Sequence, residues 1–431
     1  MSGRYRADEW QNLREDPIRE DFLARGAPPD LDRILGLFPR TTGDPAFDPD
    51  VIARAIDRLE TEPEVNTGHP FLDLSVKTGL VFIDATFRGD HPKYGVKRYG
   101  RSEHDAFPPT IIAAVDALST WGLGRRAAQL FRYWLTTFVR DDGTIDYYGP
   151  SISEYGQLLH TAAVLVERAG TEGWWEQGFG ALDRIAGHLL RLREQAEPED
   201  GLLFGSPEAD MREDRGKYFH NNAWAAKGLA RWADACEGVS ASPVTSVSTF
   251  RSVARALTAD TLAAIEQTWR EDPDDWWLPP QVEPVGSPTS PVASLPASER
   301  PGSLTSTRLA SYANYRYWPE LLSSGVLPAE AADRVIEARL SAGGQFCGMT
   351  RFGDGLDDWP LAEYLLGLWS LGRKDDFLVS LYGHVAYHQA DEHLTAYEQI
   401  TAPPFRERAP YCLPCQLVAA RAARLLVGEA P

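Results

Sequence analysis

Apolar side chains recur every three or four residues along most of this chain, and glycine or proline interrupts the pattern at intervals. This spacing places the apolar residues on one face of a helix, and the interruptions mark where helices end. No segment shows the alternation that is typical of a strand. The pattern predicts twelve main helices, at residues 69–87, 106–122, 124–139, 153–169, 173–194, 218–236, 247–271, 307–323, 328–341, 358–371, 374–389 and 408–427. A further short helix is expected near 49–61.

The connections between these helices alternate in length. Short links follow residues 122, 169, 236, 323 and 371, whereas long links cover 88–105, 140–152, 195–217, 272–306, 342–357 and 390–407. Helix–helix connections usually have about 2–8 residues, and much longer loops often carry function. Strict alternation indicates helical hairpins whose long loops all lie at one end. We therefore predict an all-α fold, an (α/α)6 toroid of helical hairpins, with inner helices that are apolar nearly all round.

The same rhythm predicts the domain organisation. We expect one toroidal catalytic domain over residues 65–431, with residues 1–64 as an N-terminal extension that packs on it. Residues 279–306 are rich in proline and serine, which is typical of a flexible linker. The helices on both sides continue the hairpin rhythm, so we favour a long loop within one domain. Whether this loop is an ordered lid stays open.

Charge and composition exclude several classes of protein. The formal net charge is −19, which opposes binding to nucleic acid or to an anionic membrane. No apolar run is long enough to span a membrane, and the first residues lack the apolar core of a signal peptide. A cytoplasmic location is expected. Cys412 and Cys415 form a C-x-x-C, but no second pair completes a zinc site, so we expect structural thiols. No metal or cofactor is expected.

Carboxylates gather in two of the long loops. Glu208, Asp210 and Glu213 lie close together in DGLLFGSPEADMRED, and Glu398 lies between an aromatic residue and a glutamine in the last long loop. In a toroid both loops rise at the same end. Two carboxylates on either side of a glycosidic bond can hydrolyse it, one by donating a proton and the other by activating water. Their surroundings must separate their pKa values.

The loops and the helix starts that follow them also carry polar and aromatic side chains suited to the hydroxyl groups and ring faces of a sugar. We predict substrate binding by Arg101, His104, Asp105, Tyr155, Gln157, His220, Asn221, Trp276, Trp277, Asp357, Trp359 and Tyr397.

Structural roles compete with binding at several of these positions. Asp105, Ser153 and Asp358 each stand where a helix N-cap is expected. One of the adjacent tryptophans Trp276 and Trp277 packs the loop if the other faces a sugar. Acids clustered between 208 and 214 are typical of a solvated surface. His220 and Asn221 are unusual at the start of an apolar inner helix unless a polar partner meets them.

Three segments resemble the six-hairpin glycosidases, the superfamily of glucoamylases, trehalases and α-L-rhamnosidases. They are YGRSEHDAF, DGLLFGSPEADMRED followed by YFHNNAWAAKGL, and YEQITAPPFRERAPYCLPCQLVAARAARLL. The resemblance implies an (α/α)6 toroid in which Asp105 binds the terminal sugar and Glu398 is the general base. It places the general acid in the second segment, where we prefer Glu208 on its proline-anchored loop, with Asp210 and Glu213 as alternates.

We therefore expect an inverting glycosidase that acts on a small or oligomeric carbohydrate. A lyase, epimerase, hydratase or isomerase on the same fold remains an alternative, as does a degenerate carbohydrate-binding protein. The net charge of −19 disfavours a lyase that binds uronates. An epimerase would use histidines such as His104, His220 or His393.

Overall fold

The computed structural model describes residues 65–68, 70–272, 275–282, 313–341, 343–352, 355–390, 394–401 and 411–427. The expected extension over 1–64, the helix near 49–61, His393 and most of the Pro/Ser-rich loop lie outside these ranges. The chain divides into two compact units. The first unit holds the described parts of Leu135–Gly344 and Arg351–Gly353, and the second holds the described parts of Arg4–Trp134, Gln345–Thr350 and Asp354–Pro431.

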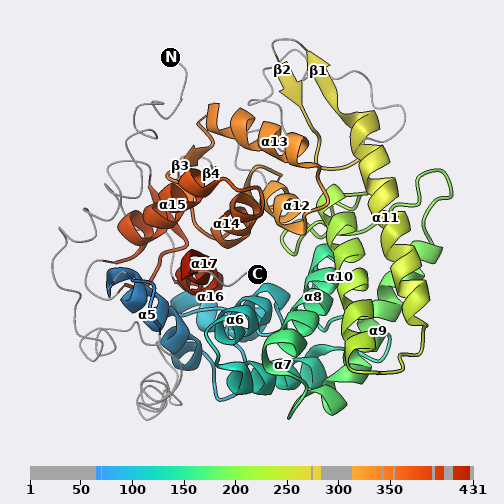
Figure 1. Ribbon diagram of the computed structural model, residues 1–431, viewed down its shortest axis with the longest axis horizontal. Coiled ribbons are helices and arrows are strands. Elements are labelled where there is room, and N and C mark those ends of the chain that lie inside the picture. The colour runs from blue at the N-terminus through green and yellow to red at the C-terminus, as the bar shows by residue number, and fades with distance from the viewer. Residues whose placement is uncertain are drawn as a thin grey trace. The chain divides into compact units, whose positions relative to one another are not determined.

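Helical hairpins build the first unit. Its helices are α8 (Ile152–Ala169), α9 (Trp175–Glu194), α10 (Phe219–Gly238), α11 (Val247–Thr268), the π-helical turn η5 (Ala313–Tyr317), α12 (Trp318–Ser324) and α13 (Ala329–Ser341). A short antiparallel pair, β1 (Arg270–Asp272) and β2 (Asp275–Trp277), follows α11. Helix α10 lies beside α8 and α11 and also contacts α12 (Figure 1).

Glycines allow α8 and α10 to approach each other closely. A Cβ added at Gly156 would overlap the backbone of Trp224, and one added at Gly228 would overlap the backbone of Gly156. The helix backbones therefore touch where these residues cross. This contact fixes the start of α8 against the start of α10, and both helix starts carry polar side chains.

The start of α8 is held by a capping box. The Ser151 side chain accepts the Ser153 backbone N–H, and the Glu154 carboxylate accepts the Ser151 backbone N–H at 3.0 Å. The sequence indicated Ser153 as the cap, so that prediction is wrong by two residues. The cap leaves Ser153 and Glu154 buried on the first turn of the helix.

The second unit is also mainly helical. It contains α5 (Pro70–Thr86), the 3-10 turns η1 (Lys97–Gly100) and η2 (Ser102–His104), α6 (Pro108–Thr120), α14 (Leu361–Ser370), α15 (Lys374–Gly383), the π-helical turn η6 (His384–His388), α16 (Leu413–Gln416), α17 (Val418–Ala422) and η7 (Ala423–Val427). The chain passes from this unit to the first within α7 (Gly124–Phe138). Helix α17 contacts α5, α6, α14 and α15, which explains why nearly all its side chains are buried.

A small sheet accompanies these helices. Its strands are β3 (Gln345–Phe346), β4 (Met349–Phe352), β5 (Gly355–Asp357) and β6 (Gln399–Thr401), in the order β3-β4-β5-β6. Strands β5 and β6 are antiparallel, with Asp357 opposite Gln399. The register therefore brings two predicted loops, which are distant in sequence, side by side.

Most predicted helices agree with the structure to within three residues at each end, as for 124–139 and α7. The predicted helix 408–427 instead forms the short pieces α16, α17 and η7, and 374–389 ends in a π-helical turn. The expected absence of strands was wrong. Six strands of two to four residues occur among the described residues, five of them in the predicted long loops and β1 at the end of the predicted helix 247–271. Strands this short show no alternation in the sequence. Among the described helices, none combines the length and apolarity needed to cross a membrane.

Candidate functional site

The acidic loop of the first unit, defined here as residues 203–211, is tied to the start of α10 through backbone atoms. Asn222 accepts the N–H of Leu203 at 2.8 Å, and Asn221 donates to the carbonyl of Ser206 at 2.9 Å. His220 Nε2 lies 3.2 Å from the carbonyl of Pro207, so this nitrogen carries the hydrogen. Burial lowers the pKa of His220 to about 3, which keeps the ring neutral.

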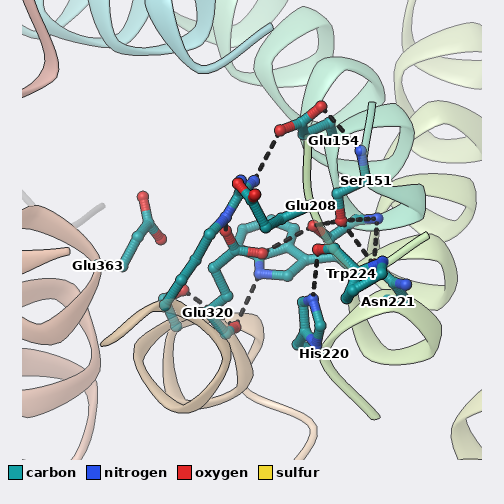
Figure 2. Close-up of polar contacts among 12 residues, drawn as sticks. Ser151, Glu154, Glu208, His220, Asn221, Trp224, Glu320 and Glu363 are labelled. Carbon is teal, nitrogen blue, oxygen red and sulfur yellow. Dashed lines mark hydrogen bonds and ion pairs between the residues drawn. The ribbon is translucent and has the colours of Figure 1, made fainter. Parts of the chain in front are cut away.

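These contacts change the expected role of the polar helix start. Asn221 is fully buried, and its side chain also binds Ser151 and the backbone of Ser153. Figure 2 shows Asn221 beside Ser151 at the start of α8, whereas the ring of His220 is hydrogen-bonded to the loop carbonyl of Pro207. The polar atoms of Asn221 hold the loop and the start of α8, and the predicted role of Asn221 in substrate binding stays untested. His220 likewise supports the loop, and its Nδ1 is buried with no hydrogen-bond partner among the described residues.

Three carboxyl groups of the first unit converge on one buried arginine. Arg316 Nη2 lies 2.7 Å from Glu154, Nη1 lies 3.1 Å from Glu208, and Nε binds Glu320. Glu154, Glu208 and Glu320 are drawn together in Figure 2. All four side chains are at most 5% exposed.

One positive charge cannot balance three buried carboxylates, so part of the cluster retains protons. Burial raises the pKa of Glu154 to about 7, against the opposing effect of Arg316. Burial also raises the pKa of Glu208, although Arg316 and two backbone N–H groups favour the ionised form. The cluster is therefore both an ion-pair network and a store of protons near neutral pH.

The three acids proposed as the proton donor have different environments. Both oxygens of Glu208 are occupied, since one accepts the N–H groups of Asp210 and Met211 and the other faces Arg316. Asp210 is exposed two residues further along the same loop. The side chain of Glu213 is 93% exposed and pairs with Arg212, as expected for a solvated surface acid. Glu208 is therefore fixed by its partners inside the protein, whereas the side chain of Asp210 is exposed to solvent.

In the second unit, the segment that carries Glu398 is held on both sides. Gln416 accepts the N–H of Ala396 at 2.8 Å and donates to its carbonyl. His388 binds Tyr397 twice, with its backbone carbonyl and with Nδ1, each at 2.9 Å. Both anchors are buried. The backbone that leads to Glu398 therefore has little freedom.

Strand pairing fixes Glu398 itself. The N–H of Asp358 donates to the Glu398 carbonyl at 3.0 Å, and the Gln399 side chain donates to Asp357 at 2.8 Å. Asp358 is fixed in turn by His384, whose Nδ1 lies 2.5 Å from it. Supporting hydrogen bonds of this kind hold a functional side chain in one geometry.

The Glu398 carboxylate is half-buried and accepts a hydrogen bond from the Tyr99 hydroxyl. Asp357 lies nearby and is fully buried. Burial, followed by the charge of Glu398, raises the pKa of Asp357 well above its usual range. The second unit therefore places a buried carboxyl with a raised pKa near a carboxylate that accepts a hydrogen bond. Such a separation of carboxyl environments is typical of acid–base sites.

Asp105 is not the cap of α6, because the N-cap is Phe107 and makes no side-chain hydrogen bond. Instead Lys93 binds both oxygens of Asp105 at 2.8 Å, and His91 binds one at 2.7 Å. Arg101 is exposed, and His104 packs among aromatic rings. Asp358 is likewise no cap, since Pro360 precedes α14. Sugar binding by Arg101, His104 and Asp105 stays a prediction.

Tyr155 follows Glu154 in α8, but its side chain contacts other residues than the Arg316 cluster. Its ring packs 4.8 Å from His188 of α9, and its hydroxyl accepts the N–H of Ile145 at 3.4 Å. These contacts give Tyr155 a structural role, and its predicted role in substrate binding stays untested. Gln157 is buried one turn after Ser153 and Glu154 and shares their face, so its predicted role remains untested.

The remaining aromatic candidates have mixed outcomes. Trp359 is half-buried and donates its backbone N–H to Asp357 at 2.8 Å. Tyr397 stacks on Tyr411 with 4.7 Å between ring centroids, and this packing supports the segment that carries Glu398. The side chains of Trp276 and Trp277 lie outside the part of the chain that is described.

The two cysteines of the C-x-x-C have their Sγ atoms 3.2 Å apart, and both are fully buried. Burial raises the pKa of each thiol, which favours the unreactive protonated form. Within the described ranges, no group of three or more histidines, cysteines or acids is arranged to hold a metal ion.

Sequence reasoning missed Arg316, Glu320 and Tyr99. Arg316 and Glu320 lie four residues apart in the otherwise apolar run NYRYWPELL. Opposite charges at this spacing inside an apolar segment are a signal of a buried ion pair. Tyr99 carried no comparable signal, because its partner is distant in sequence.

Comparisons with known proteins place the fold. No family model matches the chain, and no curated protein matches its sequence. A solved structure described as "Glycosidase Wild Type" matches with a TM-score of 0.53 and 12% identity over 88% of this chain and 97% of that chain. A rhamnosidase from Klebsiella oxytoca with rhamnose bound matches with a TM-score of 0.52 and 11% identity, over 84% of this chain and 64% of that chain.

A metal-independent α-mannosidase from Streptococcus pneumoniae, in a complex with α-1,6-mannobiose, matches with a TM-score of 0.52 and 10% identity. That match covers 89% of this chain and 100% of the other. At such identities the likeness concerns the fold. It confirms the predicted fold class, an all-α arrangement of (α/α)6 helical hairpins, and the structures that share it are glycosidases.

Proposed function

We propose that this protein is a glycoside hydrolase in which Glu398 is the general base that activates water. The observation that supports this most strongly is the environment of Glu398. Its backbone is held on both sides, and its carboxylate accepts a hydrogen bond from the Tyr99 hydroxyl. Its side chain is half-buried, so part of it stays accessible to solvent. A base needs a fixed position, an ionised form and access to a water molecule. The fold shared with glycosidases supports the same assignment.

For the proton donor, the geometry of the acidic loop favours Asp210 over Glu208. Glu208 is 4% exposed and has no oxygen without a donor, so it anchors the loop. Asp210 is exposed, and its backbone is held by the anchor. Glu208 remains the second candidate, because burial raises its pKa as a general acid requires. We propose an inverting reaction, and the substrate class is a small or oligomeric glycoside.

A glycoside panel tests the proposed function. The full chain is incubated with disaccharides and aryl glycosides of differing sugar and anomeric configuration, and sugar release is measured. We expect hydrolysis of at least one substrate, and NMR of the first product should show the inverted anomer. Glu330→Gln is the matched control, because Glu330 is exposed on α13 and should leave the rate unchanged. A sugar that raises the melting temperature but is never cleaved would instead favour a carbohydrate-binding protein.

A further inference from the structure

Arg316 links the acidic loop to two helices of the first unit. Among the described residues of this unit, no other charged side chain is seen to do so. It reaches Glu208 in the loop, Glu154 in α8 and Glu320 in α12, with separations of 108 and 162 residues to the first two. Its guanidinium group is 1% exposed. The planar fork of arginine presents five N–H donors in fixed directions, whereas lysine is a compact point charge on a flexible stem.

The π-helical turn η5 explains how Arg316 reaches the loop. In this turn the two consecutive residues Arg316 and Tyr317 both support the loop. Arg316 binds Glu208, and Tyr317 stacks on His220 at 4.4 Å between ring centroids. His220 in turn binds the carbonyl of Pro207. Single π-helical turns recur at functional sites, because the extra residue redirects side chains.

Glu208 connects Arg316 to the backbone of Asp210. One oxygen of Glu208 faces Arg316, and the other accepts the N–H groups of Asp210 and Met211. Without Arg316, Glu208 would be one of three buried carboxyl groups with no positive partner in the cluster. Glu208 would then become protonated or turn toward water, and the two N–H groups would lose their fixed acceptor.

We propose that Arg316 is the positioning residue of the acidic loop, which holds Asp210 in its working position through Glu208. This inference rests on the proposed function as far as catalysis is concerned. The mechanical part, that Arg316 holds residues 208–211, does not depend on any activity. The two parts are therefore tested separately.

The mechanical part is tested by hydrogen exchange of the full chain, followed in the peptide that contains Asp210 and Met211. In Arg316→Met we expect exchange of these amides to be at least about tenfold faster, because a broken buried ion pair is costly. Glu208→Gln should cause a similar change, and the double variant should add little to either. Arg316→Lys should fall between wild type and Arg316→Met, and it keeps the test valid if Arg316→Met does not fold.

Arg421 provides the matched control. It is an arginine of the second unit whose side chain is 9% exposed and bridges Asp116 and Glu363, each at 2.8 Å. Arg421→Met also breaks an ion-pair network, a partly buried one, but it should leave exchange in the acidic loop unchanged. If Arg316→Met leaves the loop amides as protected as in wild type, or if Arg421→Met exposes them equally, the inference is overturned.

The catalytic part is tested on the glycoside that wild type hydrolyses best. Arg316→Met should lower kcat by at least about tenfold with little change in KM, and Arg316→Lys should recover part of the loss. Unchanged kcat in Arg316→Met would refute the catalytic part even if the loop is loosened. If wild type hydrolyses no glycoside, the proposed function fails, while the exchange experiment still decides whether Arg316 positions the loop.

Discussion

The Tyr99 hydroxyl donates a hydrogen bond to the Glu398 carboxylate across 299 positions of sequence. Tyr99 lies in the 3-10 turn η1, and its ring packs 4.8 Å from Tyr94, which is buried. The donor is therefore held in place independently of Glu398. A hydrogen bond to the ionised form of a carboxylate stabilises that form, which is what the proposed role of Glu398 as a base requires.

Removal of this donor should weaken the base. Tyr99→Phe keeps the ring packing and deletes the hydroxyl. We expect kcat to fall by about 10–100-fold, because the carboxylate loses both an orienting contact and a stabilising donor. The acidic limb of the pH profile of kcat/KM should move to higher pH. An unchanged acidic limb would show that Tyr99 does not support the ionised form of Glu398.

Asp210 and Glu208 can be separated by their dependence on the leaving group. Asp210→Asn should lower hydrolysis of natural glycosides by about 10²–10⁴-fold. The variant should retain most activity on a glycosyl fluoride, whose leaving group needs no proton. Glu208→Gln should slow both substrates, because it loosens the loop. If instead Glu208→Gln alone spares the fluoride, Glu208 is the proton donor and our assignment of Asp210 is wrong.

The Arg316 cluster predicts a pH dependence of stability. The pKa of Glu154 is about 7 in the folded protein and near 4.5 when unfolded, so the folded state binds more protons between these values. The free energy of unfolding should therefore fall as pH rises from about 4.5 to 7, and the contribution of Glu154 to this fall is at most about 3 kcal/mol.

Urea unfolding at several pH values measures this slope. Glu154→Gln removes the titrating group and should make the slope shallower. The buried Glu208 and Asp357 have raised pKa values and contribute in the same direction, so part of the slope should remain. A slope that is as steep in Glu154→Gln as in wild type would exclude Glu154 as the titrating group.

The close crossing of α8 and α10 predicts a local intolerance of side chains. Gly156→Ala would place a Cβ against the Trp224 backbone, and we expect a loss of about 1–3 kcal/mol in unfolding free energy. Gly238→Ala is the matched control, since a Cβ there meets no atom within 4 Å. Urea midpoints of the two variants give the comparison, and equal midpoints would contradict a backbone contact at Gly156.

The sequence predicted the fold well because the fold depends on local periodicity. The predicted helix 124–139 and the observed α7 differ by one residue at one end, and glycine and proline marked most helix ends. The predicted fold class is confirmed by the structures that share it. The broken helix at the C-terminus was missed because its apolar pattern continues through α16, α17 and η7.

The site was harder to predict because its contacts are distant in sequence. Polar residues at the start of α10 indicated a polar partner, but whether that partner is a ligand or a loop depends on tertiary packing. Asn221 binds the loop and the start of α8. Arg316 was missed because two of its three partners lie more than 100 residues away. The roles of Glu398 and of the acidic loop stay predictions.

The most direct test of the account is the rate of Glu398→Gln on the best glycoside found for wild type. Gln keeps the size of the side chain and can still accept the Tyr99 hydroxyl, but it cannot take a proton from water. We predict that kcat falls by about 10²–10⁴-fold while the melting temperature and KM stay close to wild type. Hydrolysis at the wild-type rate by a folded Glu398→Gln protein would contradict the central claim.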